Sequence, residues 1–103
     1  MSQLTLVEQG DGRFLVDGDL TFATINKRTL KSMKALAAHK DITIDLGQVQ
    51  NTDSAGLALM IEWIRYCRGK RAMLRFSNVP AQLLSLARLS GFDKDAHFTV
   101  HLK

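Results

Sequence analysis

The segment NTDSAGLAL, residues 51–59, places a carboxylate, a hydroxyl and small apolar residues where a helix is expected to begin. Asp53 or Thr52 can cap that helix, because a side-chain oxygen there accepts a hydrogen bond from a free backbone N–H. Ser54 would then lie in the first turn, where free N–H groups and the positive end of the helix dipole converge. A phosphate on Ser54 would gain hydrogen bonds and add a charge of about −1.5 to −2. The segment therefore supports two hypotheses, a simple cap and a phosphorylation site that controls binding.

The other reactive residues do not form a recognisable catalytic or metal site. His39, His97 and His101 lack the spacing and the cysteine pair of a metal site, and we expect the last two to be exposed on one strand face. Cys67 is the only cysteine, so an internal disulfide is excluded. The chain has no glycine-rich phosphate loop and no convincing pair of carboxylates. We therefore expect a protein that is not an enzyme and that uses no metal or cofactor.

Composition indicates one globular domain that spans residues 1–103. Apolar residues make up 46% of the chain, and no apolar run is long enough to cross a bilayer. The N-terminus lacks the pattern of a signal peptide, so we expect a cytoplasmic protein. The net charge is +4, and the basic residues gather in two groups, Lys27, Arg28, Lys31 and Lys34 in one and Arg65, Arg68, Lys70 and Arg71 in the other. Aromatic residues do not alternate with these cations, which argues against nucleic acid but leaves an acidic partner or proximity to anionic lipid open.

Hydrophobic periodicity predicts alternating strands and helices. The expected strands are residues 4–8, 13–17, 41–46, 71–76 and 97–102, and the expected helices are residues 22–38, 54–68 and 80–90. Gly10-Asp11-Gly12 predicts a hairpin turn between the first two strands. On the first helix, Phe22 and Ile25 would belong to the core face. The order β-β-α-β-α-β-α-β predicts an α/β fold, a mixed sheet with helices packed against it and residues 41–46 at a central position.

A helical wheel of residues 54–68 predicts a core face and an unusually apolar outer face. The expected core face consists of Leu57, Met60, Ile61, Ile64 and Cys67. The expected outer face consists of Ala55, Ala58, Leu59, Glu62 and Tyr66, with Trp63 near its edge. A docked partner would explain such a face, and so would a third helix or the C-terminal strand lying over it.

The segment DITIDLGQVQNTDSAGLALM, supported by VDGDLTF and LLSLARLSGF, resembles the STAS domain family, named for sulfate transporters and anti-sigma factor antagonists. This resemblance covers nearly the whole chain and implies a non-catalytic, protein-binding α/β domain. In the antagonists, the hydroxyl residue that matches Ser54 is phosphorylated by a partner serine kinase. The chain departs from the antagonist pattern at Thr21, where an Asp is common, and at Ala55, which replaces a frequent second serine.

The segment DSAGLALMIEWIR, followed by LRFSNVPAQLLSLARLSGF, is more similar to the small cytoplasmic STAS subunit of the Mla-type ABC transporter. That resemblance implies a subunit that docks on the transporter ATPase, and through it on the permease, in phospholipid transport that maintains outer-membrane lipid asymmetry. The residue matching Ser54 belongs to the contact region. The predicted partner-binding residues are Asp53, Ser54, Ala55, Ala58, Leu59, Glu62, Trp63 and Tyr66. The alternative is an anti-sigma factor antagonist controlled by phosphorylation of Ser54.

Overall fold

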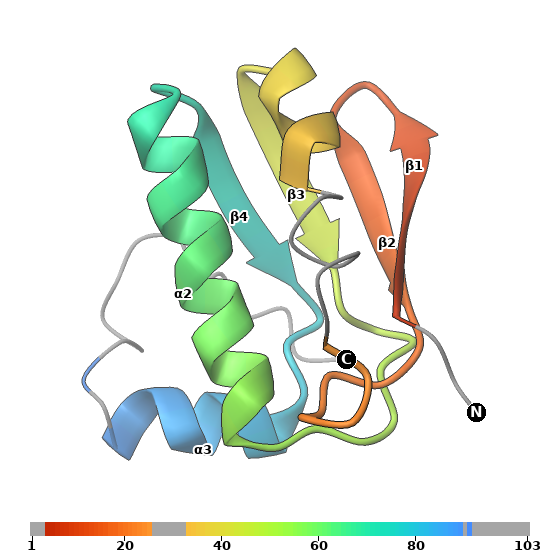
Figure 1. Cartoon of the computed structure of the whole chain (residues 1–103), viewed down its shortest axis with the longest axis vertical. Coiled ribbons are helices and arrows are strands. Elements are labelled where there is room, and N and C mark those ends of the chain that lie inside the picture. The colour runs from red at the N-terminus through yellow and green to blue at the C-terminus, as the bar shows by residue number, and fades with distance from the viewer. Residues whose placement is uncertain (1–3, 26–32, 90, 92–103) are drawn as a thin grey trace.

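A four-stranded mixed sheet forms the centre of the computed structural model, which describes residues 4–25, 33–89 and 91 (Figure 1). Its strands lie in the order β1-β2-β3-β4 and comprise β1 (Thr5–Gly10), β2 (Arg13–Asp17), β3 (Asp41–Asp45) and β4 (Met73–Ser77). The first two strands are antiparallel, whereas β2–β3 and β3–β4 are parallel. The predicted mixed α/β fold and the central position of β3 are therefore confirmed.

The β1–β2 hairpin turns at the glycine-rich segment that the sequence indicated. Gly10, Asp11 and Gly12 all have positive φ angles, a conformation that glycine adopts readily and aspartate tolerates. A side chain at Gly12 would also collide with the next strand, because an added Cβ would lie 2.1 Å from the carbonyl oxygen of Asp41. The turn thus sets the register in which β2 pairs with both of its neighbours.

Helix α2 (Ser54–Gly69) packs along the sheet, and the shorter α3 (Ala81–Leu89) lies near its N-terminal end (Figure 1). A 3₁₀ helix, η1 (Met33–Ala38), precedes β3 and also contacts α2. Residues 21–25 form a tight turn instead of the start of a helix over 22–38, with hydrogen bonds from the N–H groups of Thr24 and Ile25 to the carbonyl of Thr21. Residues 26–32 and the predicted strand 97–102 lie outside the described residues.

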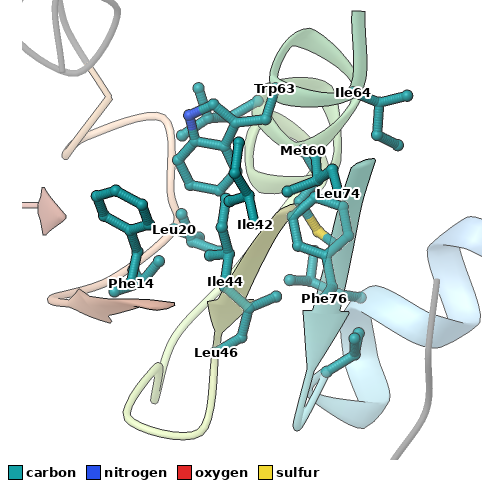
Figure 2. Close-up of a cluster of buried hydrophobic side chains, with 14 of the residues drawn as sticks. Phe14, Leu20, Ile42, Ile44, Leu46, Met60, Trp63, Ile64, Leu74 and Phe76 are labelled. Carbon is teal, nitrogen blue, oxygen red and sulfur yellow. The ribbon is translucent and has the colours of Figure 1, made fainter. Parts of the chain in front are cut away.

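The core is built between the sheet and α2. Alternate residues of the strands point toward the helix, and Figure 2 shows Ile42, Ile44, Leu74 and Phe76 gathered around Met60 and Trp63 of α2. The Trp63 and Phe76 rings lie 6.2 Å apart between centroids. All six side chains are almost completely buried. This packing fixes which side of α2 remains exposed.

Candidate functional site

Two segments far apart in the sequence meet at the start of α2. Leu20 forms a parallel bridge with Thr52, its N–H donates to the carbonyl of Asn51 (3.0 Å), and its carbonyl accepts from the N–H of Asp53 (3.2 Å). The Asp19 carboxylate accepts hydrogen bonds from the backbone and side-chain nitrogens of Asn51, both at 3.3 Å. These contacts hold the loop after β2 against the residues that lead into α2.

Gly56 allows this close approach. A Cβ added to it would lie 2.6 Å from both the carbonyl oxygen of Leu20 and the Oγ1 of Thr52. Any larger residue would therefore push the first turn of α2 away from the loop. The glycine of the Asp-Ser-Ala-Gly segment thus has a packing role that its helical position alone does not reveal.

Asp53, one of the two predicted candidates, is the N-cap of α2. Its Oδ1 accepts a hydrogen bond from the N–H of Ala55 (2.8 Å), and its Oδ2 accepts one from the N–H of Phe22 (3.1 Å). One carboxylate therefore both caps the helix and anchors the loop. Thr52, the other candidate, is buried instead, and its Oγ1 has no hydrogen-bond partner within the described structure.

The exposed side of α2 differs from the predicted one at two positions. Ser54, Ala58 and Glu62 are exposed, and Ala55 and Tyr66 are partly buried. These five residues lie on one side of the helix, and we refer to them as the α2 outer face. Of the residues predicted for the outer face, Ala58 and Glu62 are exposed, and Ala55 and Tyr66 are exposed only in part.

Leu59 and Trp63 do not belong to that face, so the prediction that they are available to a partner is wrong. Leu59 is 3% exposed and Trp63 is fully buried. The buried side of α2 is rotated toward these two residues relative to the predicted wheel, and Ile61, expected in the core, is only partly buried. The physical reason is the size of the Trp63 ring, which fills the space over Phe76 and removes more apolar area from water than Ile61 could.

Phe22 was not predicted as a site residue, yet its backbone lies against Asp53, the N-cap of α2. The wheel placed it in the core of a helix, but its side chain is 83% exposed. Its backbone is fixed by the hydrogen bond to Asp53 and by the turn in which the Thr24 hydroxyl bonds to the carbonyls of Asp19 and Thr21. A sequence signal for this turn was present in Gly18-Asp19, which interrupts the apolar pattern just before Phe22.

The cysteine and the described histidine, which lie outside the start of α2, are buried or paired with neighbouring side chains. Cys67 is buried, as predicted, and burial raises the pKa of its thiol to about 11, so it remains protonated at neutral pH. His39 lies 3.0 Å from a carboxylate oxygen of Glu8 and packs edge-on against Phe14. Across residues 4–25, 33–89 and 91, three or more metal-binding side chains do not come together at any point. The predicted exposure of His97 and His101 falls outside the described residues.

The fold and the exposed start of α2 define an α/β domain of the STAS type. A family model described as "Mlab, STAS domain" matches residues 6–102, and the chain therefore belongs to this family of STAS domains. A comparison with curated proteins found no significant match. None of the described helices is both long enough and apolar enough to span a bilayer.

Three solved structures share the fold at low sequence identity. The phosphorylated form of the Bacillus cell fate determinant SpoIIAA is 13% identical with a TM-score of 0.68, and the comparison covers 97% of this chain and 92% of that one. The anti-sigma factor antagonist SpoIIAA in its unphosphorylated form is 10% identical with a TM-score of 0.62, with coverages of 97% and 89%. SLC26A9 is 14% identical with a TM-score of 0.59, and the match covers 88% of this chain but 18% of that protein.

Proposed function

We propose that this chain is the non-enzymatic, cytoplasmic STAS subunit of an Mla-type ABC transporter. In this role it docks on the ATPase subunit and supports the assembly and activity of a complex that transports phospholipid and maintains outer-membrane lipid asymmetry. The family match to the Mlab type of STAS domain supports the proposal. The observation that carries it is the α2 outer face, where the Ser54 hydroxyl and Ala58 are exposed and the nearby Phe22, bonded to the N-cap Asp53, exposes its ring.

The chemistry of this face suits a protein partner. Ala55 and Ala58 allow the backbone of a partner to approach closely, and Phe22 and Tyr66 offer aromatic area of the kind that dominates binding energy. The hydrogen bonds of Asp53 hold the loop and the helix in one arrangement, so little conformational entropy is lost on docking. Glu62, which lies 3.5 Å from Arg65, gives the face a polar margin.

The proposal is tested by co-purification of the chain with the ATPase and by the affinity of the pair. We expect Ser54→Arg to abolish the association, because a long cation at the N-terminal end of the face, beside Ala55 and Ala58, prevents close approach. Ser85→Arg is the matched control, because Ser85 is an exposed serine on α3 and is not part of the α2 outer face. Leu59 is unsuitable as a test position, since a charge at this buried site would unfold the domain. If Ser54→Arg binds as well as the control does, the proposed surface is wrong.

A second candidate is an anti-sigma factor antagonist that a serine kinase controls through Ser54. It is favoured by one observation, the exposed hydroxyl directly after the N-cap of α2, in a fold shared with a phosphorylated antagonist. A phosphate there would add negative charge beside Asp53 and the partner-facing side of the helix. This candidate predicts a phosphoserine at Ser54 by mass spectrometry and weaker partner binding for Ser54→Asp. Neighbouring genes for an ABC ATPase and permease, or for a sigma factor and kinase, distinguish the two candidates.

A further inference from the structure

The C-terminal end of α2 contains an arginine in a backbone conformation that arginine rarely adopts. Arg71 has a φ of 56°, in the left-handed region. Within the described chain, the other non-glycine residues with positive φ are Asp11 and Asn78, and these residue types tolerate that region. Arg71 is the first residue beyond the helix cap of a Schellman motif, because its N–H donates to the carbonyl of Arg68 (3.1 Å) and the N–H of Ala72 donates to that of Cys67 (2.8 Å).

Glycine is the usual residue at this position, and the chain places its glycine two residues earlier. Gly69 lies inside the helix, whereas Arg71 occupies the left-handed site. A cation near a helix C-terminus interacts favourably with the dipole, but Arg68 and Lys70 already supply that interaction. The strained arginine is therefore better explained by its exposed guanidinium than by the stability of the helix.

Arg71 belongs to a group of exposed cations at this end of the domain. Arg68, Lys70 and Arg71 lie within four consecutive residues, and the carbonyl of Lys40 accepts a hydrogen bond from the N–H of Met73 (2.7 Å), two residues after Arg71. We call these four cations the basic end. The neighbouring carboxylate of Asp41 pairs with Arg75 at 3.8 Å. Arg71 makes no ion pair with an acidic residue of the described chain.

The basic end lies at the opposite end of α2 from Ser54, and it meets the α2 outer face only at Tyr66, whose ring the Lys70 ammonium covers. Helix α2 has sixteen residues and is therefore about 24 Å long, with Ser54 at one end and Gly69 at the other. Figure 1 shows the C-terminus of α2 at the top, beside the start of β4, and the N-terminus of α2 at the bottom. Asp19, Asp45 and Asp53 lie at or lead into the opposite, N-terminal end, whereas Asp41, which pairs with Arg75, and Asp11 of the hairpin turn are acids at the same end as the cations.

We propose that the basic end binds the phosphate groups of an anionic phospholipid membrane. Clustered lysine and arginine side chains attract an anionic leaflet, and the exposed Met73 (58%) lies two residues from Arg71, where an apolar side chain can enter the headgroup boundary. Nucleic acid is a poorer fit, because the aromatic ring at this end, Tyr66, already has the ammonium group of Lys70 over it at 5.9 Å. The surface requires only the isolated domain, so it does not depend on the ATPase partner proposed above.

The test is binding of the purified chain to vesicles of phosphatidylcholine with and without 30% phosphatidylglycerol. Each cation near an anionic surface contributes about fivefold to the binding constant. We expect binding to the anionic vesicles alone, with loss at high salt. Lys70→Gln with Arg71→Gln should weaken it about 25-fold, the product of two such factors. Arg88→Gln removes an exposed cation from α3 and should leave binding nearly unchanged. Soluble glycerol phosphate at millimolar concentration should not compete, which separates a membrane from a free phosphate ligand.

Arg71→Gly separates this proposal from a structural role. Glycine relieves the left-handed strain, so the urea midpoint should rise while binding to the anionic vesicles falls about fivefold. Arg71→Lys should keep the binding. Binding to neutral vesicles, equal losses for Arg88→Gln and Arg71→Gly, or binding to an oligonucleotide but not to vesicles would each overturn the proposal. An intact vesicle interaction together with failed ATPase association would instead refute only the proposed function.

Discussion

Replacing Gly56 with alanine tests how the site is held together. The added Cβ would lie 2.6 Å from the carbonyl oxygen of Leu20 and 3.0 Å from its Cβ, and both atoms belong to a buried residue that cannot easily move. Overpacking of this kind costs about 1–3 kcal/mol. Displacement of α2 would also weaken the two backbone hydrogen bonds of Leu20, each of which contributes about 1 kcal/mol. Alanine returns about 1 kcal/mol in helix propensity. The expected net loss is about 2–4 kcal/mol.

The matched control is Gly69→Ala in the same helix. An added Cβ there would meet no atom within 4 Å, so the helix propensity is the main effect, and the variant should be more stable by about 0.5–1 kcal/mol. Urea unfolding can be followed by the fluorescence of Trp63, which is the only tryptophan and is fully buried. Gly56→Ala should also lower the melting temperature by roughly 8 °C or more. If both variants shift the stability in the same direction, the close contact between Gly56 and Leu20 does not govern the fold.

Three further predictions concern two carboxylates that connect segments of the chain and the buried thiol of Cys67. Asp53→Ala should lower the free energy of unfolding by about 1–2 kcal/mol in urea titration, because two backbone N–H groups lose their acceptor; an unchanged midpoint would contradict the bridging role. Asp45→Ala should lower it by about 1–2 kcal/mol, since its Oδ1 accepts from the N–H of Gly47 (2.8 Å) and the Nδ2 of Asn78 (3.0 Å). Cys67 should react with iodoacetamide at pH 8 only after unfolding. The pKa of the Cys67 thiol is about 11 in the folded chain and 9.0 in the unfolded chain, so the unfolded chain loses this proton first as the pH rises. The free energy of unfolding of the wild type relative to Cys67→Ala should therefore be constant below pH 9 and fall between pH 9 and 11. A difference that does not change with pH would refute the burial argument.

Most elements of the fold could be predicted because their signals are local. The strand Arg13–Asp17 agrees with the prediction at both ends, and α2 begins at the predicted residue, Ser54, after an aspartate cap. The central strand of the sheet was visible in its alternating isoleucines, Ile42 and Ile44, which are buried. In each case the residues that determine the element lie within it or directly beside it, so no distant contact is needed to recognise it.

The errors in the site arise from contacts between distant segments. Phe22 fits the periodicity of a helix, but the carboxylate of Asp53, thirty-one residues later, holds its N–H in a turn that leaves the ring exposed. The wheel gave Trp63 and Ile61 the wrong relative burial because helical periodicity does not include the shape of the surface on which the helix packs. That surface contains Phe76, whose ring packs against Trp63, and the helix is therefore oriented with Trp63 toward the sheet.

The sequence by itself determined the class of fold, the position of the helix start and the presence of a capped serine beside small residues, because backbone conformation and amphipathic period depend on near neighbours. Only the tertiary structure decided which of those residues face outward. It placed the backbone of Phe22 against the N-cap Asp53, buried Leu59 and Trp63, and gave Arg71 the left-handed position beyond α2. Those outcomes depend on how the sheet, the loop after β2 and the helix fill space together, which no single segment of the chain encodes.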